Sequence, residues 1–400
     1  MANHKKAKIL EYIWDHPGVY RKRMAKTLGY RLNLVSDLVR ELISEEWLAE
    51  GESQSNGLGR APIPLYIDSE HKFAIAIRYD QKGLEGALIN SQGKIIKKIE
   101  HKIALSKPEQ VVNEIADLVE QLRKTVPSTV VGIGLADPSM VDTTKGTVVR
   151  SSILPEWRDV PLAKMVAERV NLPIFIEDDT RARALGEYLS RPQWRQSNEP
   201  MFYVAYGETL GFALANDDGI WRGAGLAGEI GHVVFDSSGP YCKCGGRGCL
   251  ESVICGAALE ERAMKLLEQP TDSLLKTRKS VSIEDIFEAF EAGDRLAKNL
   301  VGEITPQLGM VMSFLVSALH PKYVVVAGES NVISNCLCKE LQKEVEARSF
   351  PEIASSIEFI EGGDFKSIGL VGMGLTVFDE QISRSGEAFV RSDNYLKARR

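Results

Sequence analysis

Three cysteines within eight positions constrain the fold of this chain more than any other feature. They stand in the stretch Cys242-Lys-Cys244-Gly-Gly-Arg-Gly-Cys249, and a histidine precedes the first of them by ten residues. One imidazole and three thiolates are the soft ligand set of a closed tetrahedral Zn²⁺ site, and glycines let the chain turn tightly enough for three sulfurs to face one ion. We therefore expect a structural zinc site, with reduced, metal-free packing as the alternative. Its ligands are His232, Cys242, Cys244 and Cys249.

The remaining cysteines and the N-terminus indicate a reducing compartment. Six cysteines in 400 residues are no disulfide framework, and the first 16 residues lack the apolar stretch of an export signal. The most apolar segment, residues 308–328, is interrupted by His320-Pro321 and predicts a buried helix followed by a buried strand, each too short to span a bilayer. We expect a cytoplasmic protein without membrane contact, in which Cys255, Cys336 and Cys338 are core residues.

Charge is distributed unevenly along the chain. The whole sequence has 49 Lys and Arg against 55 Asp and Glu, which argues against a protein that is basic throughout. Residues 1–40 nevertheless hold nine basic against three acidic side chains, whereas residues 67–400 hold 39 against 47. A chain of this length with 44% hydrophobic residues forms more than one packed unit. A small basic head therefore precedes a larger acidic body.

The head has the pattern of a winged helix-turn-helix. Apolar residues at helical spacing predict three short helices, separated by Pro17-Gly18 and by Gly29. A turn rich in Gly, Ser and Asn (residues 51–59) and a strand-like segment at 63–67 follow them, as in a β-wing. The apolar stripe of the third helix consists of Val35, Leu38, Val39, Leu42 and Ile43.

Polar and basic side chains opposite this stripe are candidates for DNA contact. Short polar groups near the start of a recognition helix reach base edges, flanking basic groups bind phosphates, and an Arg in a slim wing enters a minor groove. The candidates are Arg21, Lys22, Arg23, Arg31, Asn33, Ser36, Arg40 and Arg60. Asp37 on the same face argues against part of this assignment, and a protein-interaction module with solvated charges is the alternative.

The body alternates strand-like and helix-like segments, which is typical of an α/β protein with mixed sheets and two lobes. No internal repeat is evident in the sequence. The predicted helices include 109–122 and 180–189, and the predicted strands include 73–77, 86–90, 130–135, 173–177, 202–206, 212–215 and 323–327.

Two groups of carboxylates in the body are candidates for binding a sugar. Asp178 and Asp179 follow a predicted strand, a position where open α/β folds place ligands, and Asp179 could act as a general base toward a sugar hydroxyl. Glu229 and Glu251 flank the cysteine cluster, and a zinc-folded loop could bring them to one pocket. Alternatively, Asp178 or Asp179 caps the helix at 180–189.

At these residues the sequence resembles the ROK family of repressors, open reading frames and sugar kinases. The segments GEIGH and CKCGGRGCLE carry the resemblance, EDDTRARALGE resembles the family's catalytic segment, and the Gly59-Arg60-Ala61-Pro62 wing resembles its repressor branch. The resemblance spans residues 5–375 and implies an actin-like, ribonuclease-H-like body of two lobes. It implies a head at 1–68, a first lobe at 69–190 to which 371–400 return, and a second lobe at 191–370.

The resemblance also assigns roles to individual residues. His232, Cys242, Cys244 and Cys249 match the zinc ligands. Asp179 stands in the place of the kinase base, and His232 lies both on the metal and close to the sugar. The positions that match sugar contacts are Asp178, Asp179, Glu229, His232 and Glu251.

Three departures from the kinase pattern argue against ATP binding. The first phosphate loop, D-x-G-G-T in kinases, corresponds to residues 78–82, where Arg78 replaces the Asp and both glycines are lost. The second loop corresponds to 207–213, where Glu208 would repel phosphate, and the adenosine-side Gly-Gly reads Gly328-Glu329. We therefore expect no ATP cofactor and no catalysis, and Asp179 as a vestigial base that only forms hydrogen bonds.

The sugar side departs from the family as well. A family Asn that contacts the sugar corresponds to Ile153, and another corresponds to Asp178. We therefore expect either a ligand that differs from glucose or a pocket with a lower affinity for sugar. Trp157 either forms a wall of the cleft or belongs to the core.

Together these patterns predict a sugar-responsive DNA-binding transcriptional regulator, a repressor that binds operator DNA as a homodimer or homotetramer. Two alternatives remain open at this stage. One is an ATP-dependent sugar kinase with an accessory DNA-binding head, and the other is a constitutive DNA binder without a ligand.

Overall fold

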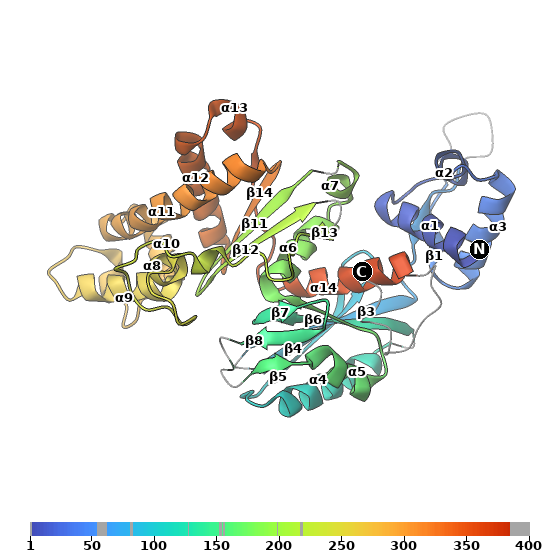
Figure 1. Cartoon of the computed structure of the whole chain (residues 1–400), viewed down its shortest axis with the longest axis horizontal. Coiled ribbons are helices and arrows are strands. Elements are labelled where there is room, and N and C mark those ends of the chain that lie inside the picture. The colour runs from blue at the N-terminus through green and yellow to red at the C-terminus, as the bar shows by residue number, and fades with distance from the viewer. Residues whose placement is uncertain are drawn as a thin grey trace. The chain divides into compact units, whose positions relative to one another are not determined.

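A computed structural model describes residues 2–53, 62–80, 83–126, 128–151, 154, 157–197, 199–216 and 219–384. Within these residues the chain forms two compact units (Figure 1). The first unit comprises Met1–Ser197 and Gly369–Arg400, and the second comprises Asn198–Ile368. The chain therefore passes from one unit to the other twice, after Ser197 and after Ile368.

The first unit begins with the head, and the winged helix-turn-helix expected from the sequence is confirmed. Each helix buries the apolar residues of its period, among them Ile13, Met24 and Val39, and Gly29 ends the second helix in the left-handed conformation. Residues 54–61 of the wing, including Arg60, lie outside the described residues. The elements are α1 (Ala2–Asp15), α2 (Arg21–Leu28), α3 (Leu32–Ser44) and the antiparallel strands β1 (Leu48–Glu50) and β2 (Leu65–Ile67).

A five-stranded mixed sheet forms the centre of the first unit, with strand order β10-β6-β3-β4-β5. The first three strands in sequence pair antiparallel, and β6 and β10 continue the sheet in parallel. The strands are β3 (Lys72–Asp80), β4 (Gly83–Asn90), β5 (Ile95–Lys102), β6 (Thr129–Asp137) and β10 (Ile174–Asp178).

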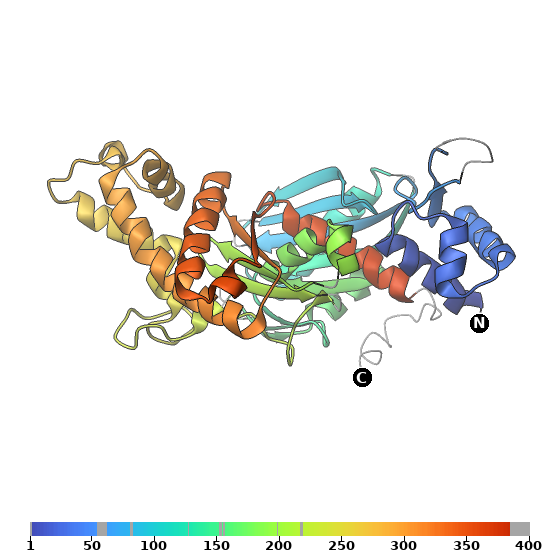
Figure 2. The same cartoon turned by 90° about the horizontal axis from the view of Figure 1, so that it is seen from above.

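Helices and a small antiparallel sheet complete the first unit. The helices are α4 (Pro108–Arg123), α5 (Leu162–Val170), α6 (Asp179–Leu189), α7 (Pro192–Ser197) and α14 (Ile368–Arg384). The small sheet consists of β7 (Met140–Asp142), β8 (Thr147–Arg150) and β9 (Arg158–Val160). The C-terminal helix α14, drawn in red, lies among the blue and green elements of this unit in both views (Figures 1 and 2).

The second unit also has a five-stranded sheet, with strand order β13-β12-β11-β14-β15. Its strands are β11 (Met201–Tyr206), β12 (Leu210–Asn216), β13 (Gly219–Ile220), β14 (Tyr323–Gly328) and β15 (Glu358–Glu361). Its helices are η1 (Ile230–His232), α8 (Leu250–Ile254), α9 (Gly256–Leu267), η2 (Leu274–Thr277), α10 (Ile283–Glu291), α11 (Arg295–Leu319), α12 (Asn331–Arg348) and α13 (Pro351–Ala354).

The two sheets have the same topology. In each, the first strand in sequence lies at the centre, two antiparallel strands extend the sheet on one side, and two parallel strands extend it on the other. This duplication, which the sequence did not reveal, is the two-lobed actin-like architecture implied by the family resemblance. The expected fold class is therefore confirmed.

The most apolar segment of the chain forms the end of α11 and strand β14. Among the described residues, α11 is the one helix with the length and hydropathy of a membrane span. Its inner face, with residues such as Leu308 and Met312, packs into the core of the second unit. His320 ends the helix in the left-handed conformation. The prediction of a buried strand is confirmed, but the helix is longer than expected, at 25 residues, and is only partly buried, because its outer face with Met310 and Phe314 is exposed.

Two further predictions concern core residues. Trp157 is fully buried, and its indole N–H donates to the carbonyl of Ser106 at 2.8 Å, so it belongs to the core of the first unit and does not line a cleft. Cys255, Cys336 and Cys338 are buried, as expected.

Candidate functional site

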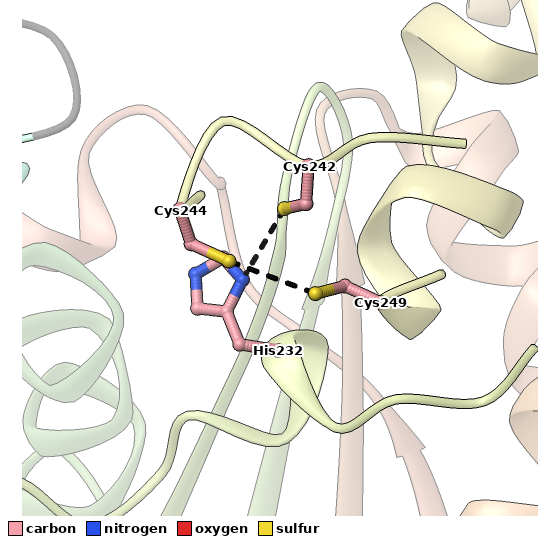
Figure 3. Close-up of side chains that lie close together, drawn as sticks. All are labelled: His232, Cys242, Cys244 and Cys249. Carbon is pink, nitrogen blue, oxygen red and sulfur yellow. Dashed lines mark hydrogen bonds between the residues drawn. The ribbon is translucent and has the colours of Figure 1, made fainter. Parts of the chain in front are cut away.

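Four side chains of the second unit converge on one point (Figure 3). Their ligand atoms all lie within 4.8 Å of one another. The Sγ of Cys242 is 3.6 Å from Nδ1 of His232, and the Sγ atoms of Cys244 and Cys249 are 3.6 Å apart. In a tetrahedral site with bonds of about 2.0–2.3 Å, neighbouring ligand atoms lie about 3.6–3.8 Å apart. The cluster therefore has the dimensions needed to hold a metal ion.

Glycines make this convergence possible. A Cβ on Gly246 would lie 3.2 Å from Sγ of Cys249 and 3.3 Å from Sγ of Cys244, which would crowd both sulfurs. Gly248 has φ +71°, and a Cβ there would lie 1.5 Å from the carbonyl oxygen of Asp236. The loop therefore requires glycine at position 248, and glycine at position 246 leaves room for the two sulfurs.

The three cysteines of the cluster differ in acidity: the pKa values of Cys242 and Cys249 are raised, mainly by burial, whereas hydrogen bonds, including the N–H of Gly246, lower the pKa of Cys244. Burial, together with the neighbouring thiols, raises the pKa of Cys249 to about 12. The free thiol at this position is thus protonated at neutral pH. A bound cation would displace that proton, as is usual when cysteine binds a metal.

His232 connects the metal cluster to the candidate sugar residues. Its Nδ1 faces Cys242, whereas its Nε2 lies 3.9 Å from Oε2 of Glu229, which is partly exposed. A carboxylate on the far nitrogen of a metal-binding histidine orients the ring. Glu251 lies on α8, and its Oε2 accepts the N–H of Leu210 at 3.2 Å. A Cβ on Gly231 would lie 2.8 Å from the carbonyl oxygen of Leu210, so η1 can pack this closely against β12 because residue 231 is glycine.

The other two candidate sugar residues belong to the first unit, at the end of β10. Asp178 is the N-cap of α6, because its side chain accepts the N–H of Arg181 at 3.0 Å. Asp179 is the first residue of that helix, and its Oδ2 lies 2.7 Å from Nη1 of Arg183. Its Oδ1 is buried and has no hydrogen-bond partner among the described residues. Of the two carboxylates, Asp179 therefore has an oxygen to offer to a ligand.

Two arginines of α6 pair with carboxylates at this end of β10, and neither arginine was among the residues predicted from the sequence. Nε of Arg181 lies 2.8 Å from Oε1 of Glu177, and both side chains are almost fully buried. Asp179 and Arg183 are four residues apart on α6, a spacing that favours such contacts, whereas Glu177 lies on β10 and pairs with Arg181 across the start of the helix. That spacing was the available signal.

A buried acid lies beneath this end of the sheet. Asp137 accepts hydrogen bonds from the hydroxyl of Tyr79 and from the backbone N–H of Ser139. Burial raises the pKa of Asp137 to about 6, and the charge of Asp179 contributes in the same direction. Burial also raises the pKa of Tyr79 well above its ordinary value. The carboxylates at the ends of β6 and β10 therefore influence one another.

Arg78 occupies the position where a kinase has the first aspartate of its phosphate loop. Its Nη1 lies 3.2 Å from Oε2 of Glu85, the residue directly opposite on β4. Gln81 and Lys82 of the same stretch lie outside the described residues. In a kinase, the aspartate at this position could bind Mg²⁺ or its waters. In this chain the position holds the guanidinium of Arg78, which is paired with Glu85.

A carboxylate of the chain itself occupies the loop that corresponds to the second phosphate loop. Oε1 of Glu329 accepts the backbone N–H of Glu208 at 2.8 Å. A Cβ on Gly207 would lie 2.0 Å from the same oxygen, so glycine is needed for this close approach. Backbone N–H groups of such loops bind phosphate oxygens in nucleotide sites. The sequence indicated that Glu329 replaces a glycine, but not that its side chain returns to this loop.

Glu329 also lines a pocket of about 370 Å³ in the second unit. Glu284 and Asp364 line the same pocket, against the single cation of Lys366. Three carboxylates give the pocket a negative potential, which disfavours a nucleotide phosphate.

The candidate DNA contacts lie mostly on the surface of the head. Lys22, Arg23, Arg31, Asn33 and Arg40 are exposed. Other candidates are engaged within the head: Nη2 of Arg21 pairs with Oε1 of Glu50 at 2.5 Å, Arg40 pairs with Asp37 at 3.2 Å, and the hydroxyl of Ser36 donates to the carbonyl of Leu32 at 2.9 Å.

Comparisons with known proteins agree with this architecture. The model of the ROK family matches residues 74–379. A protein of Caldicellulosiruptor sp. strain Rt8B.4, provisionally named a xylose repressor, is 31% identical over 88% of this chain and 90% of its own. A glucokinase of Thermotoga maritima is 26% identical over 71% of this chain and 90% of its own. A crystal structure described as a ROK family transcriptional regulator, a homologue of the Escherichia coli MLC protein, superposes with a TM-score of 0.81, at 22% identity, over 96% of this chain and 99% of that one.

Proposed function

Because this chain belongs to the ROK family, we propose that its head binds operator DNA and that a sugar bound by its body regulates this binding. The protein acts as a repressor of genes for carbohydrate uptake or metabolism. The relative named as a xylose repressor matches 88% of this chain, more than the body alone, whereas the T. maritima glucokinase matches 71%, which supports a regulator over a kinase.

One observation carries the proposal. The loop that would bind nucleotide phosphate holds the carboxylate of Glu329, while the helix-turn-helix keeps exposed basic side chains. A protein that has lost its nucleotide loop and kept a DNA-binding head can report on a sugar but cannot phosphorylate it. The similarity to the T. maritima glucokinase supports the alternative of a sugar kinase. The carboxylate of Glu329 in the phosphate loop argues against that alternative.

The sugar-binding residues we propose combine hydrogen-bond acceptors with one metal-bound imidazole. They are Asp178, Asp179, Glu229, His232 and Glu251. Carboxylates accept pairs of hydrogen bonds from adjacent hydroxyls, and charged acceptors contribute about 1.5–3 kcal/mol each. Asp178 is also the N-cap of α6, so it supports the position of Asp179 at the start of that helix.

Zn²⁺ is the metal ion we assign to His232, Cys242, Cys244 and Cys249. The donor set and the spacing of the ligand atoms fit a closed tetrahedral zinc site. All four positions are filled by the protein, so the ion would shape the loop that carries Glu229 and Glu251. It would not bind the substrate of a reaction.

The head contacts DNA through the basic and polar residues predicted from the sequence, including Arg60 in the wing. Palindromic operators are read by two matched heads, so the regulator acts as a homodimer or homotetramer. Binding should weaken steeply with salt, because exposed residues such as Lys22, Arg23 and Arg31 contact phosphates.

The proposal is tested by selecting duplexes that bind the full-length protein from a random library. The enriched duplex is then titrated with D-xylose, glucose, N-acetylglucosamine and their phosphates present in turn. We expect one sugar to change the Kd for DNA at least tenfold, and no sugar to be phosphorylated from ATP. Sugar-dependent formation of ADP by the wild-type protein would establish the kinase instead.

Replacing Glu329 by Ala should restore part of the affinity for nucleotide. The change frees the N–H of Glu208 and removes a negative charge, which is worth about 1.4 kcal/mol, or a factor of about ten in Kd. Binding of ADP is measured by calorimetry, with Glu352→Ala, which removes an exposed charge elsewhere in the unit, as control. Equal ADP affinity in wild type and both variants would contradict the blocking role of Glu329.

A further inference from the structure

The head is held against the body by two helices of the first unit, α7 and α14. On the α14 side, the indole N–H of Trp14 donates to Oδ1 of Asp379 at 2.9 Å, and the Trp14 ring stacks on Phe378 with centroids 6.3 Å apart. Trp14 is 8% exposed and Phe378 is fully buried. The last turn of α1 is thus packed into the body and not merely tethered to it.

The α7 side adds polar contacts to the same turn. Nη1 of Arg195 lies 3.1 Å from Oδ1 of Asp15, and its Nη2 donates to the carbonyl of Trp14 at 3.0 Å. The guanidinium also lies over the Trp14 ring, 5.0 Å from its centroid. Gln196 donates to the carbonyl of Asp15 at 2.6 Å. The two carbonyls that Arg195 and Gln196 bind lie at the end of α1, where backbone acceptors lack partners within the helix.

Both of these helices are joined directly to the second unit by the chain. Helix α7 ends at Ser197, the last residue before the chain enters the second unit. Helix α14 begins at Ile368, the last residue before the chain returns. A displacement of the second unit would therefore act first on the two helices that hold the head.

Helix α14 is suited to transmit such a displacement without bending. It is a continuous helix of 17 residues, about 25 Å long. Two of its glycines allow it to pack closely against its neighbours. A Cβ on Gly372 would lie 2.0 Å from the carbonyl oxygen of Ala182, and one on Gly374 would lie 2.6 Å from Cβ of Ile89. A Cβ on Gly369 would lie 3.6 Å from Oδ1 of Asp179. One end of α14 thus adjoins the oxygen available for a ligand, and its later turns hold Trp14.

We propose that this head joint, formed by Trp14, Asp15, Arg195, Gln196, Phe378 and Asp379, relays occupancy of the sugar site to the DNA-binding head. The inference rests on the proposed function, because it assumes that a sugar near Asp179 regulates DNA binding. Burial raises the pKa of Asp379 to about 6 and lowers the pKa of Arg195, so these groups are desolvated as expected of a packed joint.

The relay is tested by comparing the sugar response of DNA binding in joint variants. The response is the ratio of the Kd for the selected duplex with and without the active sugar. We expect Arg195→Gln and Trp14→Phe each to reduce this ratio at least fivefold, while sugar affinity changes less than twofold. Arg191→Lys is the matched control, because Arg191 also lies over a tryptophan, Trp194, yet contacts the body only. A ratio unchanged in both joint variants would overturn the relay.

A second measurement does not depend on a sugar. Hydrogen exchange of the full-length protein should show that Arg195→Gln speeds exchange at least tenfold in the last turn of α1, with no such change in Arg191→Lys. Unchanged exchange there would show that the joint does not hold the head, and would overturn the inference even if Trp14→Phe fails to fold. If the wild type binds DNA without any sugar response, the proposed function fails, whatever the exchange data show.

Discussion

Protein in which Cys244 is replaced by Ser is expected to hold less than about one tenth of the zinc found in wild type, and to unfold about 8 °C lower. Cys244 is one of four ligands that lie within 4.8 Å of one another, and it accepts the backbone N–H of Gly246 at 3.3 Å. Losing the ion should cost the second unit about 3 kcal/mol, which corresponds to this shift for a unit of its size. Metal content and thermal unfolding are measured on the same preparations.

Cys336→Ala is the matched control for this prediction. Cys336 is more buried than Cys244 and lies on α12, outside the cluster. Its replacement should cost about 1 kcal/mol through lost packing and leave the metal content unchanged. Wild-type protein without zinc, or a Cys244→Ser variant with a full equivalent, would contradict the metal assignment.

The second large effect is expected from Asp179→Asn, which should weaken sugar binding by about 30-fold. DNA binding by this variant should then no longer respond to the sugar concentration that is active on wild type. The change keeps the shape of the side chain but removes the charge that pairs with Arg183 at 2.7 Å and that would accept a sugar hydroxyl. Loss of a charged hydrogen bond of about 2 kcal/mol corresponds to this factor. The affinity for sugar is measured by calorimetry.

Glu109→Gln provides the comparison, since it removes the charge of an exposed carboxylate at the start of α4. Both variants should bind the selected duplex without sugar about as tightly as wild type does. An Asp179→Asn variant that keeps the sugar affinity and the response of wild type would remove Asp179 from the site.

Local patterns in the sequence were sufficient to predict about half of the helices and strands, among them the three helices of the head, α4 and α6. The apolar period of Val35, Leu38, Val39 and Leu42 produced α3, and apolar runs bounded by turns produced β3, β6 and β14. Such signals depend on residues a few positions apart, which is why they can be read without knowing the fold. The cysteine spacing likewise predicted a cluster whose atoms converge.

Contacts between distant segments could not be predicted in the same way. The shared strand order of the two sheets is set by which strands pair, and it leaves no local signal. The choice between Asp178 and Asp179 as the cap depended on one backbone contact, the N–H of Arg181. Trp14 belongs to the apolar period of α1, but its hydrogen-bond partner Asp379 lies 365 residues away.

The central claim is that sugar and DNA binding oppose each other within one molecule. It is tested by measuring the Kd of the active sugar for the protein alone and for the protein saturated with its selected duplex. Thermodynamic linkage requires the two values to differ by the same factor by which the sugar weakens DNA binding, and we expect at least tenfold. Equal sugar affinity in the presence and absence of the duplex would contradict the account.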